Sequence, residues 1–183
     1  MLADTYRRRL FDRALDQYGY VTTENARDLG IPPVELRKLA ARGGLEPIAY
    51  GVYRFEDVPR TPLDHYMEAV LRVGDDAYLT GDAVLALHDL ALVNPRRVRV
   101  GTRRRARPKL PATIELVKDD VEDDEITSYE GIPAVTVARA LRDCRSQIMG
   151  DRFLDAINSA ERRGLLRRDE AAHLRAESAG EPT

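Results

Sequence analysis

The sequence predicts an α+β fold, with helices and a hairpin in its first third and mixed short strands and helices after them. Two observations carry this prediction. Residues 20–55 read as two short helices, a tight turn between them and a two-stranded hairpin, whereas from residue 75 onward short alternating apolar runs, typical of strands, lie between segments of helical spacing. The chain of 183 residues has room for one large domain or two small ones, and its hydrophobic content of 43% is enough for real cores.

The first predicted helix covers residues 4–18. Leu10, Ala14 and Tyr18 recur at helical spacing and would pack against the segment that follows. Three arginines at residues 7–9 lie at its start. They could reach a DNA backbone or form a solvated basic turn, and the sequence favours neither.

Two short helices are predicted next, separated by a turn. Thr22 or Thr23 stands where an N-cap would, and Gly30 follows about two turns later, as a glycine beyond a helix end does. Pro32 and Pro33 then suit the first turn of a second helix, because the amides they lack would be unpaired there. A helix, a turn and a second helix are therefore expected over residues 22–42.

The second of these helices has one apolar and one basic side. Leu36 and Leu39 would face a core, and Gly43-Gly44 ends the helix. The residues left on the free side are Glu35, Arg37, Lys38, Ala41 and Arg42. After it, apolar residues around Tyr50-Gly51 predict two strands joined by a tight turn.

This order is the plan of a winged helix-turn-helix, in which the second helix enters the major groove of DNA. We therefore predict DNA binding through Arg37, Lys38 and Arg42, and through Arg54, which would reach a phosphate from the wing. The alternative is that the unit is a protein-docking or dimerisation module, because many helix-turn-helix units serve that purpose.

A polar stretch with two prolines, residues 56–62, is the best candidate for a domain boundary. We expect a winged helix-turn-helix domain over residues 1–58, a small mixed α/β domain over residues 63–177 and a frayed tail over residues 178–183. The second domain should contain helices at 63–73, 82–90, 136–145, 151–163 and 168–177, and strands near 77–80, 98–100, 113–117 and 126–135.

Two charge runs stand out in the second half of the chain. Residues 96–109 hold eight basic side chains and no acid, and residues 119–125 hold six acids. The basic run would neutralise phosphates, so Arg103, Arg104 and Arg105 are predicted to join the DNA-binding surface. Three alternatives stay open: a solvated loop, mutual neutralisation of the two runs, or contact of one run with a charged partner. The acidic run lacks the spacing of a calcium loop.

No enzyme is expected from the sequence, and no cofactor or metal site. The three histidines are scattered without ligands at metal-binding spacing, and no glycine-rich phosphate loop is present. Glu115 and Lys118 resemble the acid–lysine pair of restriction-type nucleases, but three residues apart on a strand they face opposite sides. The single cysteine, Cys144, excludes an internal disulfide and is expected in the core.

The location expected from the sequence is the cytoplasm. No apolar run approaches 18 residues, and the first residues contain no apolar segment of a secretory signal. With 29 basic and 31 acidic residues the net charge is −2, so any contact with DNA must come from a local patch.

The chain resembles AbiEi-type antitoxins of the type IV (abortive-infection, AbiE) toxin–antitoxin systems over about residues 8–165. In the N-terminal part the resemblance rests on Gly30-Ile31, Leu36, Leu39, Gly44-Leu45, Ile48 and, most specifically, Gly51-Val52-Tyr53-Arg54. In the C-terminal part it rests more loosely on Ala83, Ala86, Leu87, His88, Leu90, Pro95 and residues 131–143.

This resemblance implies a DNA-binding antitoxin that represses its own promoter and opposes a nucleotidyltransferase toxin, with the toxin-neutralising surface in the C-terminal domain. Promoter DNA, with or without inverted repeats, and the toxin are the implied partners, and no membrane is involved. The alternatives are a stand-alone transcriptional regulator of the same fold and an interaction module that no longer binds DNA. The sequence leaves a monomer and a weak dimer both open.

Overall fold

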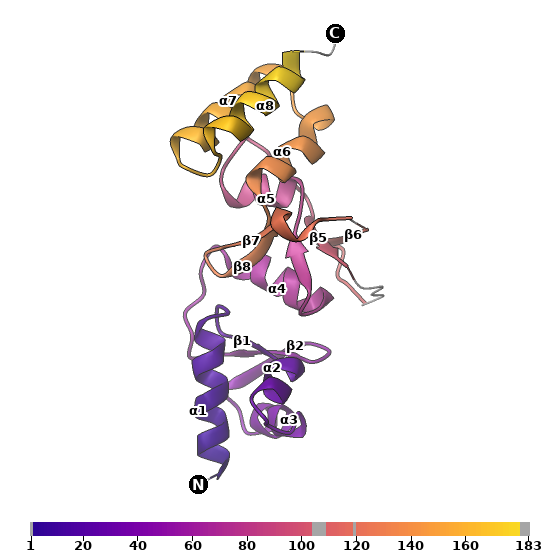
Figure 1. Cartoon of the computed structure of the whole chain (residues 1–183). Coiled ribbons are helices and arrows are strands. Elements are labelled where there is room, and N and C mark those ends of the chain that lie inside the picture. Colours follow the sequence, from indigo (N-terminus) through magenta and orange to yellow (C-terminus); the bar gives the residue numbers. More distant parts are fainter. Residues whose placement is uncertain (1, 104–108, 119, 180–183) are drawn as a thin grey trace.

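The computed structural model describes residues 2–103, 109–118 and 120–179, and shows an N-terminal and a C-terminal part stacked end to end (Figure 1). The N-terminal part is a winged helix-turn-helix with a three-stranded antiparallel sheet of order β1-β3-β2. Its elements are α1 (Leu2–Leu15), β1 (Tyr20–Thr22), α2 (Thr23–Asp28), α3 (Val34–Ala41), β2 (Leu45–Ala49) and β3 (Val52–Phe55).

The turn between α2 and α3 forms for the reasons that the sequence suggests. Thr22 caps α2 in a capping box, in which its Oγ1 accepts from the Asn25 amide and the Asn25 side chain accepts from the Thr22 amide. Gly30 takes a φ of 65°, which an L side chain rarely adopts, and so lets the chain reverse into the two prolines. The predicted N-cap and glycine stop are confirmed.

Two local predictions are wrong. Helix α1 ends at Leu15 rather than at residue 18, because Tyr18 and Gly19 both have positive φ and turn the chain into a strand. That strand, β1, is missing from the sequence-based prediction, since three residues are too few to show a period. It pairs with β3, with Tyr20 opposite Arg54, and completes the wing sheet.

The C-terminal part is a five-stranded mixed sheet of order β6-β5-β4-β8-β7 between α4 on one side and α5 and α6 on the other (Figure 1). Its strands are β4 (Ala77–Leu79), β5 (Val98–Thr102), β6 (Ile114–Lys118), β7 (Ile126–Tyr129) and β8 (Ile132–Val135). Its helices are α4 (Asp64–Val73), α5 (Asp82–Leu87), α6 (Val137–Cys144), α7 (Gly150–Arg162) and α8 (Arg168–Ala179), with 3-10 turns at 123–125 and 145–147. The predicted α+β class is confirmed.

Most predicted C-terminal elements are present, and the differences have local causes. The predicted Thr136 cap is confirmed, because its side chain accepts from the Arg139 amide at the start of α6. Helix α5 ends three residues early, since Asp89, Ala91 and Leu92 all adopt positive φ. Cys144 is a buried free thiol in the core, as expected, and burial raises its pKa to about 12.

Two clusters of buried side chains form the interior. The smaller packs α1, α2 and α3 onto the wing sheet and contains Leu10, Ala14, Val21, Ala26, Ile31, Leu36, Leu45, Tyr53 and Phe55. The larger surrounds the C-terminal sheet but also includes Tyr20 and Val52 of the wing sheet. These two side chains pack with the C-terminal part, so the two parts share buried contacts. The domain boundary predicted between residues 58 and 63 therefore stays a prediction.

A buried ion pair fastens the wing to the connection that follows it. Arg54 on β3 and Asp64 at the start of α4 are 3% and 8% exposed, with Nη2 and Oδ2 3.1 Å apart. Arg54 also donates to the carbonyls of Phe55 and Val58, while Asp64 accepts from the amide and hydroxyl of Thr61. Both charges are therefore compensated without solvent.

We predict that Asp64→Ala lowers the free energy of unfolding by about 3–5 kcal/mol, because it leaves the Arg54 guanidinium buried without its counter-charge. Replacing both partners, Arg54→Met with Asp64→Leu, should recover most of that loss. The exposed pair between Arg60 and Glu46 is the control, and Arg60→Met should change stability by less than about 1 kcal/mol. Urea unfolding followed by circular dichroism measures all three, and an Asp64→Ala loss no larger than the control would contradict the prediction.

Candidate nucleic-acid interface

Helix α3 presents its polar side to solvent at the end of the molecule farthest from α7 and α8 (Figure 1). On its inner side Leu36 is fully buried, whereas Arg37 and Lys38, and Arg42 just after the helix, are exposed. Lys38 pairs with Glu35 one turn earlier, at 2.7 Å. Within the described part of the chain, Arg37 and Arg42 make no ion pair or hydrogen bond, so their donors are available to a ligand.

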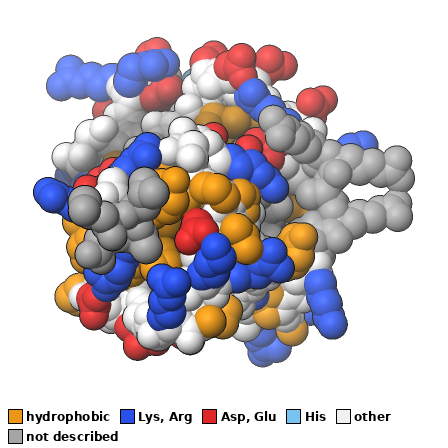
Figure 2. Space-filling view, turned by 90° about the horizontal axis from the view of Figure 1, so that it is seen from below, with side chains coloured by type: hydrophobic (Ala, Val, Ile, Leu, Met, Phe, Trp, Pro, Cys, Tyr) orange, Lys and Arg blue, Asp and Glu red, His pale blue; other side chains and the backbone are white. Residues whose placement is uncertain are grey.

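The surface around this helix mixes basic and apolar side chains. Figure 2 looks onto the end of the molecule formed by α1 and α3, and shows lysine and arginine side chains around a cluster of hydrophobic ones that also includes an acidic side chain. Val34, at the start of α3, is 39% exposed and is one of the apolar side chains near the basic ones. A surface that is basic at its edges and apolar in places suits both phosphates and base edges.

The prediction that Arg54 reaches a phosphate is wrong. The side chain is buried under the wing in the pair with Asp64, and its guanidinium lies 5.7 Å from the centre of the Tyr20 ring. Strand alternation in β3 alone cannot reveal this, because every residue of β3 is buried. The sheet is covered on one face by the N-terminal core and on the other by α4.

The turn of the wing offers a different side chain. Tyr50 is fully exposed at the tip of the β2–β3 hairpin. Its neighbour Gly51 is held firmly, because its carbonyl accepts from the Thr23 amide at 2.8 Å and a Cβ there would lie 2.9 Å from the Thr23 hydroxyl. The hairpin is thus anchored to the start of α2 with an aromatic ring projecting outward. An aromatic residue next to the turn glycine is the only sequence signal for it.

Of the three arginines at the start of α1, two make contacts within the fold and the third is exposed. Arg7 pairs with Asp57 at 2.8 Å and stacks on Phe55, and Arg9 donates to the carbonyl of Leu29. Arg8 is exposed, with no partner among the described residues. Arg7 and Arg9 therefore contribute to the packing of α1 as well as to the positive field.

The basic run of the second half is partly occupied by the acidic run. Arg103 pairs with Asp123 and donates to the carbonyl of Val121 at 3.1 Å. On the acidic side, Glu125 pairs with Arg139 and Arg142. At Arg103 and Asp123 mutual neutralisation, one of the alternatives left open by the sequence, is what occurs, whereas the arginines that pair with Glu125 belong to α6 and not to the basic run. Arg104 and Arg105 lie outside the described residues.

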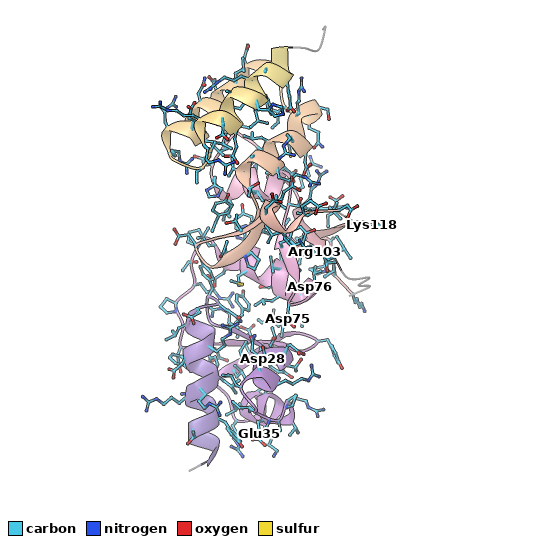
Figure 3. All side chains as sticks on the ribbon, in the orientation of Figure 1. Asp28, Glu35, Asp75, Asp76, Arg103 and Lys118 are labelled. Carbon is cyan, nitrogen blue, oxygen red and sulfur yellow. The ribbon has the colours of Figure 1, made fainter. Side chains whose placement is uncertain are left out.

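Acidic side chains limit the basic surface on the flank that faces the C-terminal part. Figure 3 labels Asp28 at the end of α2 and Asp75 after α4, on the two sides of this boundary. Partial burial raises the pKa of Asp75, and the nearby carboxylates of Glu24 and Asp28 raise it further. These carboxylates make this flank less favourable for a phosphate backbone than the exposed side of α3.

The described residues hold no cluster of histidine, cysteine or acidic side chains that could bind a metal. Glu115 and Lys118 both lie on β6, three residues apart. The Glu115 carboxylate lies 3.7 Å from Arg99, which also approaches Asp82 at 3.6 Å. None of the described helices has the length and apolar character that a membrane span requires.

Comparison with known proteins relates the N-terminal part of the chain to a protein family. Residues 8–55, from α1 to the end of β3, match the family model described as a transcriptional regulator, AbiEi antitoxin. A search of curated proteins found no significant match. Among solved structures, the RV2827C protein from Mycobacterium tuberculosis is similar at 16% sequence identity and a TM-score of 0.38, over 97% of this chain and 78% of that one.

The structural likeness is too low to support an argument, whereas the family match covers the whole helix-turn-helix and its wing. It begins within α1 and ends at Phe55, the last residue of β3. It thus includes Arg37, Lys38 and Arg42 on α3 and Tyr50 at the wing tip. The winged helix-turn-helix of this chain is thus similar to that of the AbiEi antitoxin transcriptional regulators.

Proposed function

We propose that this protein is the DNA-binding antitoxin of a type IV toxin–antitoxin system, which represses its own promoter and counteracts a nucleotidyltransferase toxin. The observation that carries the DNA half is the free side of α3, where the guanidinium groups of Arg37 and Arg42 have no partner among the described residues and lie beside Lys38. This helix lies within the segment that matches a family of transcriptional regulators. Such groups bind guanine edges or phosphates. The protein would act in the cytoplasm, where its promoter lies.

The DNA contacts fall into two groups. Side chains of α3 would read the major groove, and Tyr50 would place its ring against the sugar–phosphate backbone or the adjoining minor groove. Aromatic and apolar side chains make such contacts without adding charge. Because the only arginine of the wing strands is buried, Tyr50 takes the place that sequence reasoning gave to Arg54. A palindromic operator would require two copies, bound as a dimer or side by side.

The toxin half of the proposal rests on the family match. The C-terminal part supplies a separate surface for a protein partner, since α7 and α8 lie at the opposite end from α3 (Figure 1). Exposed apolar side chains, Leu92 at 75% and Met149 at 68%, lie in the C-terminal part. DNA and toxin would then bind at different places on one chain.

Arg37→Ala with Lys38→Ala should weaken selective binding to the DNA upstream of this protein's gene by at least about tenfold. One bidentate contact to a base is worth ~1–3 kcal/mol, and each lost phosphate contact flattens the dependence on salt. Fluorescence anisotropy at two salt concentrations, with unrelated DNA for comparison, measures both effects. Arg162→Ala with Arg168→Ala removes the same charge at the far end and should leave affinity nearly unchanged. Equal losses in the two double variants would contradict specific contact through α3.

Tyr50→Ala should weaken the same DNA complex about tenfold, which corresponds to about 1.4 kcal/mol, without lowering stability. The reason is that a fully exposed side chain supports nothing in the fold, so its removal changes unfolding by no more than ~0.5 kcal/mol. Tyr50→Phe keeps the ring and should retain most of the affinity. Unaltered DNA affinity in Tyr50→Ala would exclude the wing tip from the interface.

Co-expression tests the toxin half. A nucleotidyltransferase gene neighbouring that of this protein should arrest growth alone, and growth should recover when this protein is co-expressed. Arg37→Ala with Lys38→Ala should still restore growth when expressed from an unrelated promoter, because α3, which carries both residues, lies at the opposite end of the molecule from α7 and α8 (Figure 1). Persistent growth arrest in the presence of the folded wild-type protein would reject the antitoxin role and leave a stand-alone regulator.

A further inference from the structure

A pocket of about 490 Å³ lies between α4, the segment that precedes β5 and the start of β6. Its wall combines apolar and polar side chains in similar measure; Ala69, Ala86, Val98 and Ile114 are among the apolar ones, and Tyr66 adds an aromatic ring. Pockets that hold small molecules in proteins have volumes of about 300–1,000 Å³ and combine apolar and aromatic side chains with polar groups that fix the ligand's orientation. The volume of this pocket is in that range, and it lies apart from α3.

Two arginines are the polar groups of the lining that suit an anion. Arg96 and Arg97 line the pocket, are exposed, and make no ion pair or hydrogen bond with any described residue. Arg99, two positions later, instead approaches Asp82 at 3.6 Å and Glu115 at 3.7 Å. The guanidiniums of Arg96 and Arg97 thus keep all their donors, and this planar group matches a phosphate better than any other side chain does.

The one acid among the described lining residues is already engaged. Glu68 accepts from the Tyr20 hydroxyl at 2.8 Å and from Nε of Arg72 at 2.7 Å. Its charge is therefore largely compensated by Arg72. An anion in the pocket would meet two free guanidiniums, and His65 at the rim adds a further donor.

We propose that this pocket binds a small phosphate-bearing molecule of about mononucleotide size, with the phosphate on Arg96 and Arg97 and the ring or hydrocarbon body against Tyr66 and the apolar wall. A phosphate could also come from a DNA backbone. The concave shape and the apolar side chains of the lining favour a free molecule, because backbone contacts need only a charged surface.

Helix α4, which lines one side of the pocket, also contacts the winged helix-turn-helix. Helix α4 lies between the two parts of the molecule (Figure 1), and its Glu68 holds Tyr20 of β1. Arg72, bonded to Glu68, donates through Nη2 to the carbonyl of Ile48 on β2 at 3.0 Å. A ligand that displaces Glu68 therefore acts on two strands of the wing sheet. This coupling, which rests on the proposed DNA binding, makes the ligand an effector of the regulator.

Isothermal titration calorimetry of the full chain with AMP, ATP and inorganic phosphate tests the site without DNA. We expect saturable one-to-one binding of a nucleotide that Arg96→Gln with Arg97→Gln weakens at least about tenfold, the effect of losing ~1.4 kcal/mol of contact. Arg162→Gln with Arg168→Gln, with the same charge change at the far end, should bind as the wild type does. No saturable binding of any probe, or equal affinity in both double variants, overturns the site.

DNA titrations separate the two sources of phosphate. Arg96→Gln with Arg97→Gln should leave the affinity for upstream DNA unchanged when no nucleotide is present. If it lowers that affinity instead and nucleotides do not compete, the arginines serve the DNA backbone and the pocket proposal is overturned. A wild-type protein that binds no DNA would refute the proposed function, whereas the calorimetric result would still decide the site.

A separate experiment tests the coupling between the pocket and DNA binding. Saturating nucleotide should change the DNA affinity of the wild type by about 5- to 150-fold, the usual range for linked sites. Tyr20→Phe removes only the hydroxyl that donates to Glu68, and Tyr20 is not itself among the residues that line the pocket. It should keep nucleotide binding and lose most of the coupling. A wild type whose DNA affinity does not respond to bound nucleotide would overturn the effector role.

Discussion

The buried ion pair between Arg54 and Asp64 sets the relation between the two parts of this molecule. Arg54 is near the end of the wing and Asp64 begins α4, so each charge is compensated only when the wing lies against that helix. A charge buried without its partner is penalised by several kcal/mol, and other placements of the wing are correspondingly unfavourable. The winged helix-turn-helix thereby acquires a fixed orientation relative to the C-terminal sheet.

Helix α4 extends this junction along its whole length. From Asp64 it continues through Glu68, which accepts from Tyr20, to Arg72, which donates to the carbonyl of Ile48. The helix covers one face of the C-terminal sheet and at the same time holds all three wing strands through side-chain hydrogen bonds. An element that packs on both parts is the natural route by which events at one end could affect the other.

The arginines of this chain fall into two groups, according to whether a carboxylate or carbonyl of the protein binds the guanidinium. Arg7, Arg72 and Arg103 are bound by carboxylates or carbonyls and hold segments together. Arg37 and Arg42 on α3, and Arg96 and Arg97 at the pocket, have no such partners among the described residues. Since the protein carries a net charge of −2, any surface that binds an anion must depend on local groups such as these.

The sequence by itself determined the winged helix-turn-helix and the α+β class, because caps, turn glycines and helical spacing act over a few neighbouring residues. Thr22 and Gly30 place α2, and Leu36 orients α3 so that its basic side faces solvent. Only the tertiary structure decided the role of Arg54, since its partner Asp64 lies ten residues away on another element. The same holds for strand β1 and for the pocket of Arg96 and Arg97, because pairing and concavity arise between segments distant in the chain and leave no periodic trace in it.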